Sequence, residues 1–214
     1  GTLEITKSVT GDVPPAFSQT FNFTATCTGD PHSPYSLSID YPTKTAVTQS
    51  GIPAGSVCTV VEGARTPVDG YTWGDPKYTG NPATITAKNT TYTVAVENPI
   101  TLDTGSFEVT KVVDWNGVTP VDGTKFQICI TGPSYPDTPD CKDFTTPSDL
   151  VKTWPDLLPG DYTVTETVPG VRWSVSGSPV TVAVVSNETA KASITNKRLK
   201  SLITVCKTDT EKLP

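Results

Sequence analysis

The stretch LLPGDYTVTET, residues 157–167, decides the fold of this chain. Its Pro-Gly pair is typical of a turn, and the alternating run behind it predicts a β-strand with one apolar face. Tyr162, Val164 and Glu166 share that face. A glutamate in phase with apolar residues is unusual, because burying an unpaired charge is costly. Glu166 therefore needs partners elsewhere in the chain.

The same pattern occurs once earlier. Residues 53–63, PAGSVCTVVEG, again run from a turn containing Pro and Gly into an alternating strand. On this strand Cys58, Val60 and Glu62 share one face. Two copies of one unusual pattern predict a repeat of two similar domains.

Candidate partners lie in the opening and closing strands of each copy. Lys7 and Lys111 fall on the apolar phase of the opening strands, and Asn98 and Asn196 fall on that of the closing strands. The lysine and the glutamate are 55 residues apart in both copies (62 − 7 and 166 − 111). The glutamate and the asparagine are 36 residues apart in the first copy and 30 in the second (98 − 62 and 196 − 166). This matched triple predicts that the three side chains meet inside each domain.

These motifs resemble the Cna-B (SpaA-type) domains of Gram-positive pilins and adhesins. The resemblance covers nearly the whole chain, although the first copy has CTVVEG where the family has its usual Tyr and Thr-Glu-Thr. It is carried by Ile-Thr-Lys (5–7), Val-Thr-Lys (109–111), Tyr-Thr-Val-Thr-Glu-Thr (162–167), Glu-Asn (97–98) and Thr-Asn (195–196).

The resemblance implies that lysine and asparagine side chains join in an intramolecular isopeptide bond promoted by the glutamate. The implied bonds are Lys7–Asn98, promoted by Glu62, and Lys111–Asn196, promoted by Glu166. An amine attacks a carboxamide only when it is neutral, and burial lowers the pKa of a lysine. The glutamate can relay a proton as ammonia leaves, and strand packing supplies the proximity. The alternative is a buried Lys–Glu ion pair with the asparagine as hydrogen-bond partner, which is weak evidence for stability.

The composition agrees with two all-β domains. A chain of 214 residues suits two domains of about 100 residues each, and 20 prolines with no methionine favour short strands and turns. We expect two tandem immunoglobulin-like (Cna-B-type) β-sandwiches, residues 1–102 and 103–200, arranged end to end. Residues 201–214 resemble the first strand of a truncated third repeat, because Lys207 again falls on an apolar phase. A free tail is the alternative reading of this segment.

Within the first copy, the pattern predicts three further features. Tyr35–Tyr41 and Lys44–Gln49 should form a hairpin. Tyr71–Tyr78 should form one strand, and Thr91–Asn98 should form the closing strand.

Five cysteines with a single histidine fit disulfides better than a metal site. Disulfides place the protein outside the cytosol. The predicted pairs are Cys27–Cys58, both on inward phases, and Cys129–Cys141, which flank a Pro-rich turn and should be more exposed. Cys206 is left over.

Other features are less promising as sites. The net charge of −6 argues against a nucleic-acid partner. No transmembrane run or signal peptide occurs, so we expect an excised mature segment without membrane insertion. The four tryptophans could stack on sugars, but Trp115 continues the inward phase of Lys111 and is expected in the core. His32 is expected as a solvated loop residue, and no cofactor or metal is expected.

The expected function is structural. The chain should be a stalk or shaft segment of an extracellular, cell wall-anchored adhesin or pilin, which modifies itself once per domain and is not an enzyme with turnover. Its expected partners are neighbouring domains of the same surface protein or pilus, and host matrix proteins or glycans reached through domains outside this sequence. The alternative is a β-sandwich module that itself binds carbohydrate or matrix protein.

Overall fold

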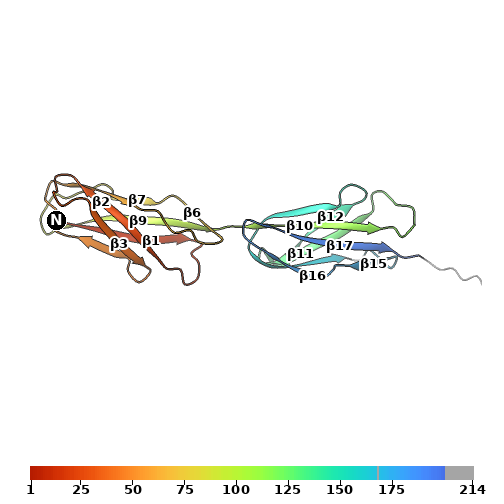
Figure 1. Cartoon of the computed structure of the whole chain (residues 1–214). Helices are drawn as coiled ribbons and strands as arrows, with labels where there is room; N and C mark the ends of the chain where they lie inside the picture. Colours follow the sequence, from red (N-terminus) through yellow and green to blue (C-terminus); the bar gives the residue numbers. More distant parts are fainter. Residues whose placement is uncertain (168, 201–214) are drawn as a thin grey trace, which may run out of the picture. The chain divides into compact units, whose positions relative to one another are not determined.

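The structure is a computed structural model that describes residues 1–167 and 169–200 (Figure 1). In these residues the regular elements are all strands. The chain divides into two compact units, the first from Gly1 to Asp103 and the second beginning at Thr104. The predicted all-β class with two β-sandwich domains is confirmed. The predicted third-repeat strand, with Cys206 and Lys207, lies outside the described residues.

The first domain consists of two sheets. Its opening strand β1 pairs in parallel with its closing strand β9, and Lys7 lies opposite Val96 in this register. One sheet has the order β4 (Ala46–Gln49), β1 (Thr2–Gly11), β9 (Thr91–Leu102), β6 (Tyr71–Trp73), with β7 (Lys77–Thr79) also on β9. The other has the order β3 (Tyr35–Tyr41), β2 (Gln19–Cys27), β5 (Val57–Glu62), β8 (Ala83–Thr84).

The second domain repeats this topology. Its opening strand β10 pairs in parallel with its closing strand β17, and Lys111 lies opposite Ile194. One sheet has the order β13 (Val151–Leu157), β10 (Gly105–Asp114), β17 (Thr189–Arg198), β15 (Trp173–Ser176). The other has the order β12 (Tyr135–Thr145), β11 (Lys125–Gly132), β14 (Gly160–Thr167), β16 (Val180–Val184).

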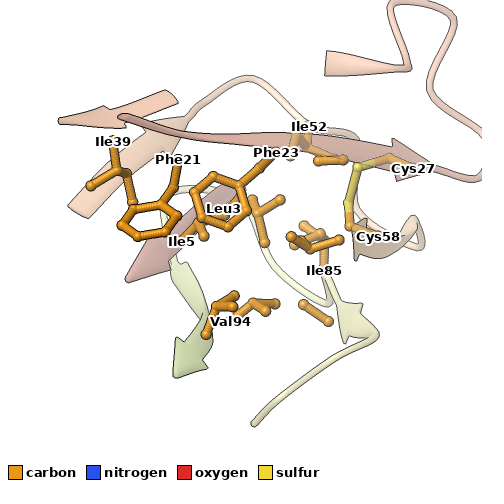
Figure 2. Packing of buried hydrophobic residues seen from close by; sticks show 14 of the residues in the cluster. Leu3, Ile5, Phe21, Phe23, Cys27, Ile39, Ile52, Cys58, Ile85 and Val94 are labelled. Carbon is orange, nitrogen blue, oxygen red and sulfur yellow. A yellow bond between two sulfur atoms is a disulfide. The ribbon is translucent and has the colours of Figure 1, made fainter. Parts of the chain in front are cut away.

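Each core lies between the two sheets of its own domain. Figure 2 shows Leu3 and Ile5 of β1 packed with Phe21 and Phe23 of the other sheet in the first domain. All four are at most 2% exposed, because they alternate with solvent-facing residues along their strands. Burial of each such side chain contributes about 1.5–3 kcal/mol. The core of the second domain likewise consists of buried aliphatic and aromatic side chains. They are Phe107, Val109, Phe126, Ile128, Ile130, Phe144, Trp154, Leu157, Tyr162, Val164, Val184 and Ile194.

Two predictions for the first domain are wrong. The expected hairpin does not form, because β3 pairs with β2 while β4 pairs with β1 in the other sheet. The turn between them changes sheets, and Lys7 N–H donates to Thr45 O at 2.8 Å. The expected strand 71–78 is divided into β6 and β7 by Gly-Asp-Pro at 74–76, although both pieces pair with β9. Both errors arise because alternation shows which residues share a face but not which strand lies alongside.

The closing strand of the first domain is longer than predicted. β9 passes Asn98 and continues to Leu102, because β6 pairs with residues 100–102. In the second domain, the Pro-rich segment expected as a turn is part of strand β12. Pro136 and Pro139 are tolerated there because β12 is the edge strand of its sheet, where a missing N–H leaves no partner unpaired.

Candidate functional site

Each domain buries one lysine, one glutamate and one asparagine between its sheets. In the second domain, Lys111 comes from β10, Asn196 from the neighbouring β17, and Glu166 from β14 of the other sheet. Their exposed fractions are 2%, 0% and 9%. Asn196 lies opposite Val113, two positions beyond Lys111 on the same face, so the lysine and the asparagine are diagonal neighbours.

The three side chains of the second domain contact one another. Lys111 Nζ donates to Asn196 Oδ1 at 2.8 Å and lies 3.2 Å from Glu166 Oε2. Asn196 Nδ2 donates to Glu166 Oε1 at 2.6 Å. Lys111 Nζ also donates to the backbone oxygen of Ile194 at 3.1 Å. The glutamate therefore contacts the amine through one carboxylate oxygen and the carboxamide nitrogen through the other.

The first domain has the same residues with looser contacts. Lys7 Nζ lies 3.4 Å from Glu62 Oε1, and Asn98 Nδ2 donates to the same oxygen at 3.0 Å. Lys7 Nζ also donates to the backbone oxygen of Ser8 at 3.2 Å. Glu62 Oε2 and Asn98 Oδ1 are buried without a hydrogen-bond partner among the described residues. The triad of Lys7, Glu62 and Asn98 is therefore assembled, but its polar atoms are less completely paired than those of the second domain.

Burial changes the protonation of both lysines. Desolvation lowers the pKa of Lys7 to about 8, although the nearby Glu62 carboxylate acts in the opposite direction. Desolvation also lowers the pKa of Lys111, against the attraction of Glu166. An aromatic ring covers each amine: the ring centroid of Phe21 lies 4.6 Å from Lys7 Nζ, and that of Phe126 lies 4.9 Å from Lys111 Nζ. A neutral, nucleophilic amine is therefore more accessible at neutral pH than it is for a solvated lysine.

This arrangement has the parts that transamidation requires. A buried amine lies beside a carboxamide, and a carboxylate contacts both the amine and the amide nitrogen that would leave. The fixed strands hold these groups together, so no translational entropy is lost when they react. The carboxylate can accept a proton from the attacking nitrogen and deliver it to the leaving one.

The structure contains both predicted disulfides. Cys27 and Cys58 face each other across β2 and β5, and both are buried. Cys129 and Cys141 face each other across β11 and β12. Cys141 is exposed, in agreement with the prediction that this second bridge is more accessible.

The remaining sequence candidates give no site. The expectation that Trp115 is a core residue is wrong: β10 ends at Asp114, and Trp115 is half-buried against the edge of Trp173, with ring centroids 5.3 Å apart. The side chain of His32 is 82% exposed, as expected for a loop residue. Among residues 1–167 and 169–200, no cluster of His, Cys, Asp or Glu could hold a metal ion. The same residues contain no helix long and apolar enough to cross a membrane.

Two polar contacts of the glutamates were not predicted. The backbone N–H of Glu62 donates to Tyr78 Oη at 3.0 Å, and that of Glu166 donates to Ser178 Oγ at 2.8 Å. Such contacts depend on sheet register, which alternation does not give. The only signal in the sequence is a short motif that occurs in both copies, Gly-Asn-Pro at 80–82 and Gly-Ser-Pro at 177–179.

Two family models match the chain, one for each domain. Residues 3–101 match a family described as a domain of unknown function (DUF5979). Residues 105–198 match the SpaA family, described as a prealbumin-like fold domain. No protein with a curated description matches the chain.

Several solved structures resemble the chain. Two B repeat units of the collagen binding protein (Cna) of Staphylococcus aureus match with 18% identity and a TM-score of 0.51, covering 92% of this chain and 49% of that one. The minor pilin GBS52 of Streptococcus agalactiae matches with 13% identity and a TM-score of 0.36, covering 96% and 99%. The major pilin T3.2 of Streptococcus pyogenes matches with 13% identity and a TM-score of 0.38, covering 92% and 97%. The chain spans about half the length of the Cna structure, and that likeness shows the fold of tandem B repeats.

Proposed function

We propose that this chain, whose second domain is a SpaA-type prealbumin-like domain, is a stalk segment of a Gram-positive surface adhesin or pilus. Each domain would be closed by an amide bond between its buried lysine and asparagine. The observation that carries the proposal is the matched triad, which links the first and last strands of both domains.

The reaction follows from the contacts in the second domain. Lys111 Nζ passes a proton to the Glu166 carboxylate and attacks Asn196 Cγ as a neutral amine. The bond between Nζ and Cγ forms and the bond between Cγ and Nδ2 breaks, while the carboxyl group delivers this first proton, and then the second proton that the attacking nitrogen loses, to the leaving nitrogen, which departs as ammonium. One ammonia is released for each bond, and the glutamate is regenerated. The 2.6 Å contact of Asn196 Nδ2 with Glu166 Oε1 supports this path, because the proton would be delivered along it.

The position of the bond suits a protein under tension. β1 and β9 run parallel and adjacent, so a force that enters at the start of β1 and leaves at the end of β9 shears one strand along the other. An amide between Lys7 and Asn98 would carry this force directly. The 90 residues between them (98 − 7 − 1) would then carry none of the load. In the second domain the bypassed segment has 84 residues (196 − 111 − 1).

A further observation supports a structural protein of the cell surface. Each domain contains a disulfide, and disulfides persist in oxidising environments outside the cytosol. The proposed reaction consumes the lysine amine and the asparagine carboxamide, so each domain reacts once and has no turnover. Its partners would be neighbouring domains of the same surface protein or pilus.

Intact mass spectrometry of the purified chain tests the proposal. Each bond removes one ammonia, so the mass should fall by about 17 Da per bond and about 34 Da in all, beyond the hydrogens lost to the disulfides. Peptide mapping should then recover the branched peptides Lys7–Asn98 and Lys111–Asn196. A mass equal to that of the disulfide-bonded, otherwise unmodified sequence would contradict the proposal. The binding-module alternative would then be tested with glycan and collagen binding screens.

A further inference from the structure

The motif Gly-polar-Pro at 80–82 and 177–179 occupies the same place in both domains. In the first domain it joins β7, which pairs with the closing strand β9, to β8, which pairs with the glutamate strand β5. In the second it joins β15, which pairs with β17, to β16, which pairs with the glutamate strand β14. We call these two segments the sheet bridges. Each passes from the sheet that carries the lysine and the asparagine to the sheet that carries the glutamate.

The glycine of each sheet bridge lies against the closing strand. A Cβ at Gly177 would lie 2.5 Å from the backbone oxygen of Ser193, and one at Gly80 would lie 2.6 Å from that of Thr93. Both glycines also have positive φ, +81° and +75°, which side chains other than glycine rarely adopt. The sheet bridge therefore touches the backbone of the strand that supplies the asparagine, at a distance that only glycine allows.

The polar residue of each sheet bridge holds the glutamate strand. In the second domain the ladder between β14 and β16 ends at Val164 and Val180. Beyond that pair, Ser178 Oγ accepts the backbone N–H of Glu166 at 2.8 Å. The Ser178 hydroxyl group thus accepts the backbone N–H of Glu166 at a point where β16 no longer pairs with β14.

The first domain reaches the same result with different residues. The Asn81 amide accepts the backbone N–H of Val60 at 2.9 Å and donates to the backbone oxygen of Val60 at 2.8 Å. Two residues further along, Tyr78 Oη accepts the backbone N–H of Glu62 at 3.0 Å. Two domains with different side chains therefore share one feature, a side-chain acceptor on the backbone N–H of the buried glutamate.

We propose that Ser178, in the second sheet bridge, and Tyr78, on β7 directly before the first, are positioning residues that hold the backbone of the buried glutamate for the two reactions. Among the hydrogen bonds of the described residues, neither hydroxyl group is bonded to a reacting atom. Both therefore act through the backbone of the glutamate. Because the lysine and the asparagine belong to one sheet and the glutamate to the other, the reaction depends on how the two sheets are held at this point. This inference rests on the proposed function, since it assigns residues to that same reaction.

The expected effect is on rate. A misplacement of about 1 Å in a reacting group can cost about a hundredfold in rate. Loss of one hydrogen bond to the glutamate backbone is a smaller disturbance, and we expect Ser178→Ala to slow the formation of the Lys111–Asn196 bond about tenfold. The Lys7–Asn98 bond should form at the wild-type rate, because its triad lies in a separate core.

The test uses the full chain made by cell-free synthesis under oxidising conditions. Samples are quenched in acid at timed intervals and digested, and the two branched peptides are quantified separately by mass. Tryptophan fluorescence of the same reactions gives the folding rate. Wild type, Ser178→Ala and Ser178→Thr are compared, and the first domain is the internal control in every sample. Ser178→Thr keeps the hydroxyl group, so it should restore the rate.

The outcomes separate this inference from the proposed function. If the wild type forms neither bond, the proposed function fails. If the wild type forms both bonds and Ser178→Ala forms the second at the wild-type rate, or only as slowly as it folds, the sheet bridge has no positioning role. Should Ser178→Ala not fold, Tyr78→Phe gives the same test in the first domain, because it removes only a hydroxyl group. An unchanged rate for Lys7–Asn98 in that folded variant would equally overturn the inference.

Discussion

Asn196 Nδ2 donates a 2.6 Å hydrogen bond to Glu166 Oε1 from the opposite sheet of the sandwich. The corresponding bond from Asn98 to Glu62 in the first domain is 3.0 Å long. This contact is present in both domains. Among the described residues of the two triads, only Lys111 also donates a hydrogen bond to the oxygen of its asparagine. The contact between the carboxylate and the amide nitrogen is therefore the part of the site that both domains share.

Replacement of Glu166 by Ala should leave the second domain folded but unlinked, because the carboxylate transfers protons and contributes little apolar packing. The mass should lie only about 17 Da below that of the variant's own disulfide-bonded sequence, where the wild type lies about 34 Da below its own, and the thermal midpoint and trypsin resistance should fall. Glu62→Ala is the matched control and should abolish only the Lys7–Asn98 bond. Loss of both bonds in either single variant would show that the domains do not react independently.

An unlinked first domain should become more stable as the pH rises from about 8 to about 10.5. In Asn98→Ala the amine of Lys7 stays free, and burial keeps its pKa in the folded state near 8, below the ordinary 10.5. The folded chain then binds fewer protons than the unfolded chain within this window, so deprotonation favours folding. Urea unfolding across the window measures the effect. The double variant Lys7→Met, Asn98→Ala lacks the amine and should show a smaller rise, and equal slopes in the two variants would refute the assignment.

The two disulfides should differ in their rate of reduction. Cys141 is exposed and Cys129 is half-buried, whereas Cys27 and Cys58 are 3% and 0% exposed. Under a mild thiol in native buffer, alkylation of Cys129 and Cys141 should precede that of the buried pair, because a thiolate must reach the sulfur that it attacks. Timed alkylation followed by peptide mapping measures both rates. The prediction fails if the buried pair is labelled first.

Pulling the chain by its ends should reveal the proposed bonds directly. An unlinked first domain that opens releases about 200 Å at about 3.3–3.6 Å per residue, because the Cys27–Cys58 disulfide, with a sequence separation of 31, keeps about a third of the 90 residues between Lys7 and Asn98 closed. The wild type should show no such step in single-molecule force spectroscopy, and the double variant Glu62→Ala, Glu166→Ala should show one for each domain. Steps of this length in the wild type would mean that the strands are not covalently joined.

Alternation along single strands predicted much of the site. Lys7, Glu166 and Asn196 were each predicted to face inward, and each is buried, because the two-residue period of a strand fixes the face on which a side chain lies. The Cys27–Cys58 pair followed from the same argument, whereas Cys129–Cys141 was predicted from the position of the two cysteines around a Pro-rich turn. That the three residues of each triad actually react stays a prediction.

The features that were missed depend on relations between strands. β3 and β4 have suitable alternation for a hairpin, but each pairs with a different sheet, which alternation does not encode. Trp115 was misplaced because the strand ends one residue before it. The hydroxyl of Ser178 lies on the backbone of Glu166 only because the ladder stops two residues earlier along β14, at Val164.

The parallel pairing of the first and last strands also bears on how such a chain can grow. Since β1 and β9 point the same way, the chain enters each sandwich at one pole and leaves at the other. A duplicated copy can therefore be appended without rerouting the polypeptide, and every added copy would carry its own lysine, glutamate and asparagine. The number of such domains could then change during evolution in whole units, without any change to the fold of each one.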